Sequence, residues 1–237
     1  METSNLSHHI SRQFNEELEE IRNKVLAMGG LVEEQIENAT AALVSGDVEQ
    51  AEGVISRDYM VNAYEVAIDE ECIQVLARRQ PAAGDLRLLV AVIKTITDLE
   101  RIGDQAEKVG RMAIHLADME RPKNQYSELQ HLGDQVRKML RGALDAFARM
   151  DAEAAANVAQ EDLKVDSEYD AIMRQMITFM MEDPRTVKRT LDTMWSARAL
   201  ERIGDHARNI CEYVVYLVKG KDVRHITLEE LSKEARE

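Results

Sequence analysis

The hexapeptide Leu-Glu-Arg-Ile-Gly-Asp occurs twice in the chain, at Leu99–Asp104 and at Leu200–Asp205. The copies are 101 residues apart, a little under half of the 237-residue length. The sequence before each copy also matches, because Asp58–Asn62 aligns with Asp162–Asp166 at an offset of 104 residues. This internal duplication predicts two related halves, the second of which is about three residues shorter in the intervening turn.

The first forty residues contain a helical pattern that favours a bundle. Apolar side chains recur there at steps of three and four residues, close to the heptad period. At 1.5 Å per residue this stripe covers about 50 Å of helix, which must lie against other long helices. With 3 prolines, 11 glycines and 4% aromatic residues, the composition also favours helices over strands. The stripe comprises Ile10, Phe14, Leu18, Ile21, Val25, Met28, Val32, Ile36, Ala39 and Leu43.

The breaks between helices are marked by turn residues. Gly46 and Asp47 offer a C-cap glycine followed by an N-cap aspartate. The three prolines, at 81, 122 and 184, each fall where one helical pattern stops and another begins. We predict an all-α fold of two pseudo-symmetric three-helix bundles, spanning residues 1–121 and 122–219, followed by a polar tail at 220–237 that ends in a short helix. The six predicted helices are 6–44, 48–79, 84–119, 125–149, 152–181 and 185–219.

The charge balance excludes several classes of partner. The formal net charge is −14, which is the wrong sign for binding nucleic acid or docking on anionic lipid. Apolar runs such as Leu88–Ile93 are too short to span a membrane, so we expect no membrane insertion. Met1–Ile10 has no cationic and apolar leader, which predicts a cytoplasmic protein. The two cysteines, Cys72 and Cys211, are expected to be buried thiols.

Each hexapeptide places two carboxylates one helical turn apart. Glu100 and Asp104 are four residues apart, as are Glu201 and Asp205, so each pair shares a helix face beside the packing stripe. The glycine in each copy costs about 1 kcal/mol of helix stability relative to alanine, which predicts the close approach of a neighbour. Two interpretations remain open for these pairs. One is a solvated face in which Arg101 and Arg202 neutralise the aspartate three residues later; the other is a metal site.

In the metal interpretation, the preceding helix of each half completes the site. Asp58 and Asn62 would join the first pair, and Asp162 and Asp166 the second, which makes the second site one carboxylate richer. A cation would relieve the repulsion between carboxylates that share a partly desolvated groove. Carboxylate and amide ligands favour Mg, Mn or Fe over Zn.

Other constellations point away from catalysis. Glu128 and His131 have the Glu-x-x-His spacing of di-iron bundles, but the motif occurs once, where such enzymes need it on two helices. No Walker-type loop, nucleophile elbow or Ser/Cys–His arrangement is present, so we predict that the protein is not an enzyme. The alternatives to a regulatory adaptor are a metal-dependent, ferritin-like carboxylate bundle enzyme and a purely structural helical scaffold.

Several segments together resemble the PhoU family, the phosphate-specific transport system accessory proteins. The resemblance extends over essentially the whole chain. Besides both hexapeptides, it includes Ile10–Phe14, Ala77–Pro81, Asp85–Arg87, Met180–Asp183 and Tyr216–Gly220.

This resemblance implies a cytoplasmic six-helix regulator that restrains phosphate uptake when phosphate is plentiful. Its partners would be the ATPase subunit of the phosphate ABC transporter and the sensor histidine kinase of the phosphate response, and it would form a homodimer. The metal motif of the family, Glu/Asp-x-x-x-Asp, maps onto Glu100 with Asp104 and onto Glu201 with Asp205. Asp58, Asn62, Asp162 and Asp166 match less closely.

Overall fold

The computed structural model describes residues 2–119 and 126–237, and side chains from Arg12 onward within those ranges. This part of the chain is helical and contains no strand, which confirms the all-α prediction. The helices are α1 (Glu2–Ser45), α2 (Val48–Arg79), α3 (Ala83–Ala117), α4 (Ser127–Arg149), α5 (Ala152–Ala159), α6 (Asp162–Glu182), a 3₁₀ turn η1 (Pro184–Thr186), α7 (Val187–Lys219) and α8 (Leu228–Arg236).

The helix boundaries follow the local turn chemistry. Gly46 closes α1 in the left-handed region at φ 78°, and the Asp47 side chain accepts a hydrogen bond from the Gln50 N–H at 3.0 Å to cap α2. The break predicted at Pro122 lies outside the described residues. The breaks predicted at the other two prolines are present: Pro81 precedes α3, and Pro184 begins the 3₁₀ turn before α7.

One predicted helix, 152–181, is wrong as a continuous element. The structure divides it into α5 and α6 at Gln160–Glu161. The N–H of Glu161 bonds to the Val158 carbonyl at 3.0 Å and the N–H of Lys164 to the Glu161 carbonyl at 2.9 Å. These i→i−3 bonds make a tight turn that interrupts the α-helical ladder. Because neither glycine nor proline stands at the break, the sequence pattern did not predict it.

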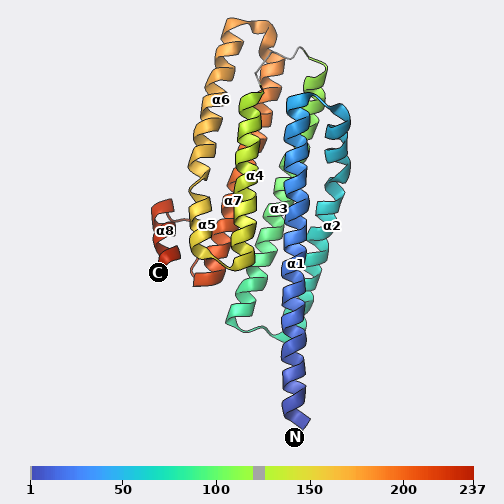
Figure 1. Cartoon of the computed structure of the whole chain (residues 1–237), viewed down its shortest axis with the longest axis vertical. Helices are drawn as coiled ribbons and strands as arrows, with labels where there is room; N and C mark the ends of the chain where they lie inside the picture. Colours follow the sequence, from blue (N-terminus) through green and yellow to red (C-terminus); the bar gives the residue numbers. More distant parts are fainter. Residues whose placement is uncertain (1, 120–125) are drawn as a thin grey trace.

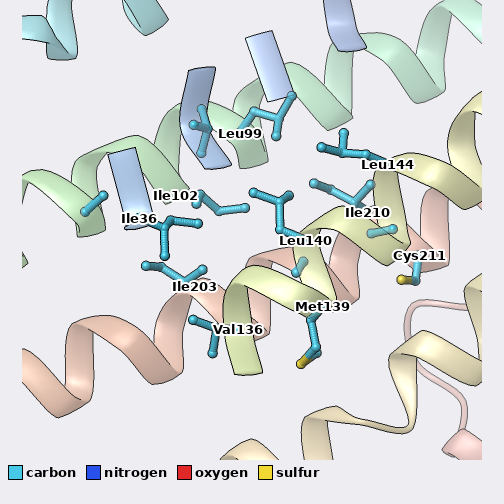
Figure 2. Close-up of a cluster of buried hydrophobic side chains, with 14 of the residues drawn as sticks. Ile36, Leu99, Ile102, Val136, Met139, Leu140, Leu144, Ile203, Ile210 and Cys211 are labelled. Atoms are coloured by element: carbon cyan, nitrogen blue, oxygen red, sulfur yellow. The ribbon is translucent and has the colours of Figure 1, made fainter. Parts of the chain in front are cut away.

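The two three-helix repeats share one continuous core. The α3 and α7 helices pack against each other at the centre; α1 covers α3, α4 covers α7, and α1 also contacts α4. Figure 1 shows α3 and α7 running in opposite directions, with α2 beside α1 and with α5 and α6 beside α4 and α7. In Figure 2, Ile102 of α3 and Ile203 of α7, which are equivalent positions of the two hexapeptides, lie in one apolar cluster with Ile36 of α1 and Val136 of α4.

Two further sequence expectations can be compared with the structure. Both cysteines are buried free thiols, as predicted, and burial raises the pKa of Cys72 to about 12. Within the described residues, no helix contains a stretch long and apolar enough to cross a membrane.

Candidate carboxylate sites

The hexapeptide glycines bring the preceding helix of each half close to the motif. A Cβ added at Gly103 would lie 3.4 Å from the Asp58 Oδ1 atom of α2. A Cβ added at Gly204 would lie 3.4 Å from the Asp162 Oδ1 atom of α6 and 3.1 Å from the Val165 side chain. The predicted close approach is therefore present in both halves, and it involves the aspartates that the sequence alignment paired.

In the first half, Asp58 faces the carboxylates of α3. Burial raises the pKa of Asp58, and the charges of Glu107 and Asp104 raise it further. Its Oδ2 atom accepts a hydrogen bond from Asn62 Nδ2 at 3.2 Å, whereas its buried Oδ1 atom has no hydrogen-bond partner. The pKa of Glu100 is raised by partial burial and then by the charges of Asp104, Glu65 and Asp58. This half therefore holds a concentration of negative charge.

In the second half, arginines bind directly to the equivalent carboxylates. Arg208 Nη1 of α7 donates to Asp162 Oδ2 at 2.9 Å, and Arg198 Nη1 donates to Glu201 Oε1 at 2.5 Å. Glu201 is 7% exposed, so it is buried and does not merely flank the packing stripe as predicted. Burial, followed by the charge of Asp205, raises the pKa of Glu201 to about 7. The pKa of Asp166 is also raised, chiefly by burial.

The two halves consequently differ in their charge balance. A shift of 101 residues places Glu107 of α3 at the position of Arg208 of α7. Glu107 adds negative charge beside Asp58, which Arg111 offsets in part by pairing with Glu107 at 2.5 Å, whereas Arg208 binds Asp162 directly. Among the described residues, no ion pair within 4.0 Å reaches Asp58, Glu100 or Asp104. At these positions the two halves hold the same number of carboxylates, because Asp166 replaces Asn62 and Arg208 replaces Glu107. Two carboxylates of the second half, Asp162 and Glu201, are paired with arginine.

The arginines that neutralise the second half are not the ones that the sequence pattern indicated. In the part of the chain that the structure describes, no ion pair joins Arg101 to Asp104 or Arg202 to Asp205. Arg198 and Arg208, which lie just outside the hexapeptide, pair instead with Glu201 and Asp162. Extending the alignment of the halves beyond the motif reveals the exchange of Glu107 for Arg208, and this signal could have identified the difference.

The donor set suits a hard cation, but the side chains do not converge on one point. Carboxylate oxygens are the ligands that Mg, Mn and Fe accept, and the Asp58 Oδ1 atom is buried without a partner. Within the described residues, however, no three His, Cys, Asp or Glu side chains lie close enough together to hold a metal ion. A cation at either motif would require side-chain rotation to gather the ligands. Metal binding by Asp58, Glu100, Asp104, Asp162, Glu201 and Asp205 therefore stays a prediction.

Comparison with known proteins places the chain in a family. The PhoU domain model matches residues 25–113 and 129–214. A "Phosphate-specific transport system accessory protein PhoU homolog" of Pseudomonas putida is 54% identical over 231 residues, which cover 98% of this chain and 90% of the relative. The Escherichia coli K12 protein, "Phosphate-specific transport system accessory protein PhoU", is 48% identical over 233 residues, covering 98% of this chain and 96% of that protein.

Solved structures agree with the sequence comparisons. The crystal structure of PhoU from Pseudomonas aeruginosa matches with a TM-score of 0.85 and 53% identity, covering 88% of this chain and 100% of that one. The phosphate transport system regulatory protein PhoU from Streptococcus pneumoniae matches with a TM-score of 0.82 and 32% identity, covering 89% and 99% of the two chains. With two matched domains, near-complete alignments and the same fold, this chain belongs to the PhoU domain family.

Proposed function

We propose that the chain is a regulatory accessory protein of a phosphate transport system, acting by protein contact and not by catalysis. The observation that carries this proposal is identity of 48–54% over nearly the full length of relatives that bear the accessory-protein name. The composition is compatible with an adaptor, because the chain is acidic and carries no recognisable nucleophile motif. Its long helices also offer extended faces for docking to other proteins.

In the finer form of this proposal, the protein couples two partners in the cytoplasm. One is the ATPase subunit of the phosphate ABC transporter, and the other is the sensor histidine kinase of the phosphate response. The protein would negatively regulate phosphate uptake and hold the kinase in its inhibited state when phosphate is plentiful. We further propose that it acts as a homodimer.

Deletion of the gene tests the regulatory role. In medium rich in phosphate, a reporter for phosphate-starvation genes is expected to rise from its repressed level to near the starved level. A plasmid copy of the wild-type gene should restore repression, and the empty plasmid serves as the control. A reporter that stays repressed in the deletion strain would contradict the proposal.

We also propose that divalent metal binds preferentially in the first half. The imbalance of charge around Asp58 supports this, because no arginine pairs with its carboxylate, whereas Arg208 and Arg198 pair with Asp162 and Glu201. A cation in the first half would lower the electrostatic free energy of the carboxylates there without displacing an arginine.

Elemental analysis after dialysis against Mg, Mn or Fe measures this preference. The Glu100→Ala/Asp104→Ala variant is expected to lose most of the bound metal, and the Glu201→Ala/Asp205→Ala variant to lose less. Equal metal content near zero in the wild type and both variants would assign the motif to packing or partner contact. Turnover of redox-active iron would instead support the ferritin-like enzyme.

A further inference from the structure

A groove of about 560 Å³ lies between α3 and α7, and Arg198, which binds Glu201 of the second carboxylate site, is one of its lining residues. No residue of α1 or α4 lines it, so it follows a side of the central helix pair that those helices leave uncovered. Trp195, the single tryptophan of the chain, is 65% exposed there. The lining residues that matter here are Lys108, Met112 and His115 of α3 and Trp195, Ala199 and Arg202 of α7.

The spacing of the lining residues suits a helical ligand. On each helix the three residues follow one another at steps of four and three, so each helix presents one face along two turns. All of them lie within the helix interiors, where backbone N–H groups are already bonded to the preceding turn. The groove therefore lacks the free N–H groups that cradle the phosphates of a nucleotide. Its place between two helices, with Trp195 and Met112 in its lining, instead suits the helix-in-groove mode of peptide recognition.

The groove is cationic in a strongly acidic protein. Lys108, Arg198 and Arg202 line it against a single acidic residue, Asp192, although the chain has a net charge of −14. Arg198 is paired with Glu201, but Lys108 and Arg202 form no ion pair within the described part of the chain. Charge complementarity therefore favours an occupant that carries carboxylates.

The pseudo-symmetry of the fold shows which residues occupy the equivalent surface. A shift of 101 residues maps Met112 onto Tyr213, His115 onto Tyr216 and Trp195 onto Lys94. There, the Lys94 Nζ atom lies 5.5 Å from the centroids of both tyrosine rings, which are half-buried.

The segment after α7 places an acidic side chain near Lys94. The charge of Lys94 contributes to the lowered pKa of Asp222, of which the hydrogen bond from Arg224 is the main cause. The next residue, Val223, is buried. An acidic side chain near a cation, followed in the chain by a buried apolar one, thus occurs at the end of the seam that is equivalent to the groove.

We propose that the groove between α3 and α7 docks an amphipathic acidic helix of a protein partner. Apolar side chains of that helix pack on Trp195 and Met112, and its carboxylates face Lys108 and Arg202. The inference rests on the proposed function, in which signalling passes through protein contacts, and it names the surface that makes one of them.

The single tryptophan provides the test, because the indole fluorescence of the chain reports only on Trp195. The purified chain is titrated with the purified ATPase subunit of the phosphate transporter and, separately, with the purified cytoplasmic region of the sensor kinase. One of them is expected to shift the emission to shorter wavelength as the indole leaves water. Affinity is measured in parallel by calorimetry.

A charge-reversed variant and a matched control define the site. Lys108→Glu/Arg202→Glu is expected to weaken binding at least about tenfold, because it places like charges against the acidic helix. Lys233→Glu/Arg236→Glu changes the net charge equally but lies on α8, where both side chains are exposed, and should bind like the wild type. Circular dichroism verifies that both variants are folded.

Several outcomes would overturn the inference. If a partner binds without changing the emission, and binds the charge-reversed variant equally well, the groove is not the interface, while the proposed function stands. If neither partner binds the wild type, both the coupling and the groove assignment fail. An emission change caused by ATP alone would assign the groove to a nucleotide. A change that depends only on the concentration of the chain would assign it to a second copy.

Discussion

Replacing Asp98 by alanine is expected to lower the free energy of unfolding by about 3 kcal/mol. Asp98 of α3 is almost fully buried, and its Oδ1 atom bonds to His206 Nδ1 of α7 at 2.7 Å and accepts from Asn209 Nδ2 at 3.2 Å. The His206 Nε2 atom already has no hydrogen-bond partner. The alanine variant would therefore leave a buried imidazole with neither nitrogen bonded. Urea unfolding followed by circular dichroism measures the loss.

The duplication supplies a matched rescue for this variant. At the positions equivalent to Asp98 and His206, the chain has Ala199 and Gln105, which are both buried. The double variant Asp98→Ala/His206→Gln is expected to recover about half of the lost stability, because it removes the unpaired imidazole and the aspartate together. If the two substitutions destabilise additively, the hydrogen bond is not what makes Asp98 important.

Replacing Glu201 by glutamine is expected to stabilise the metal-free protein at pH 8 by up to about 3 kcal/mol. The ordinary pKa of this carboxyl is 4.5, and in the fold it is raised to about 7. Between these values the folded chain retains a proton that the unfolded chain releases, so the free energy of unfolding falls as the pH rises. Glutamine imitates the protonated form and avoids this loss.

Chemical unfolding of both proteins with a chelator present checks the sign of the effect. The gain should be largest at pH 8 and shrink towards zero as the pH is lowered to about 4. Glu229→Gln removes the same charge from an exposed position on α8 and should leave the pH dependence unchanged. If the wild type and the Glu201→Gln variant lose stability in parallel between pH 5 and pH 8, the raised pKa of Glu201 is contradicted.

The sequence predicted the fold wherever local chemistry marks the chain. The Gly46–Asp47 turn and the apolar stripe of the first helix have physical signatures in their own residues, a capping pair and a helical period. The interruption at Gln160–Glu161 has no such signature, since neither glycine nor proline stands there; α5 contacts α4, α7 and α8, while α6 continues along α7. The spacing of apolar residues indicates which face of a helix is buried. It does not indicate a turn after which the apolar residues are still buried.

The sequence predicted the backbone approach at the candidate sites but not all of the side-chain pairing. Glycine in a helix interior carries a cost, so Gly103 and Gly204 indicated that a neighbour comes close, and the structure places Asp58 and Asp162 there. Arg198 and Glu201 are three residues apart on α7, a spacing that the sequence contains. The pair of Arg208 with Asp162 joins α7 to α6, so it emerged only from the structure.

The antiparallel packing of α3 and α7 around equivalent isoleucines has a consequence for stoichiometry. A symmetric dimer built from one repeat would display the same seam twice, and a ligand could occupy it in two opposite orientations. The two repeats of this chain differ along the seam, with Tyr213 and Tyr216 at one end and Trp195 at the other. The two ends are therefore chemically distinct, so the surface that one end presents is not repeated at the other.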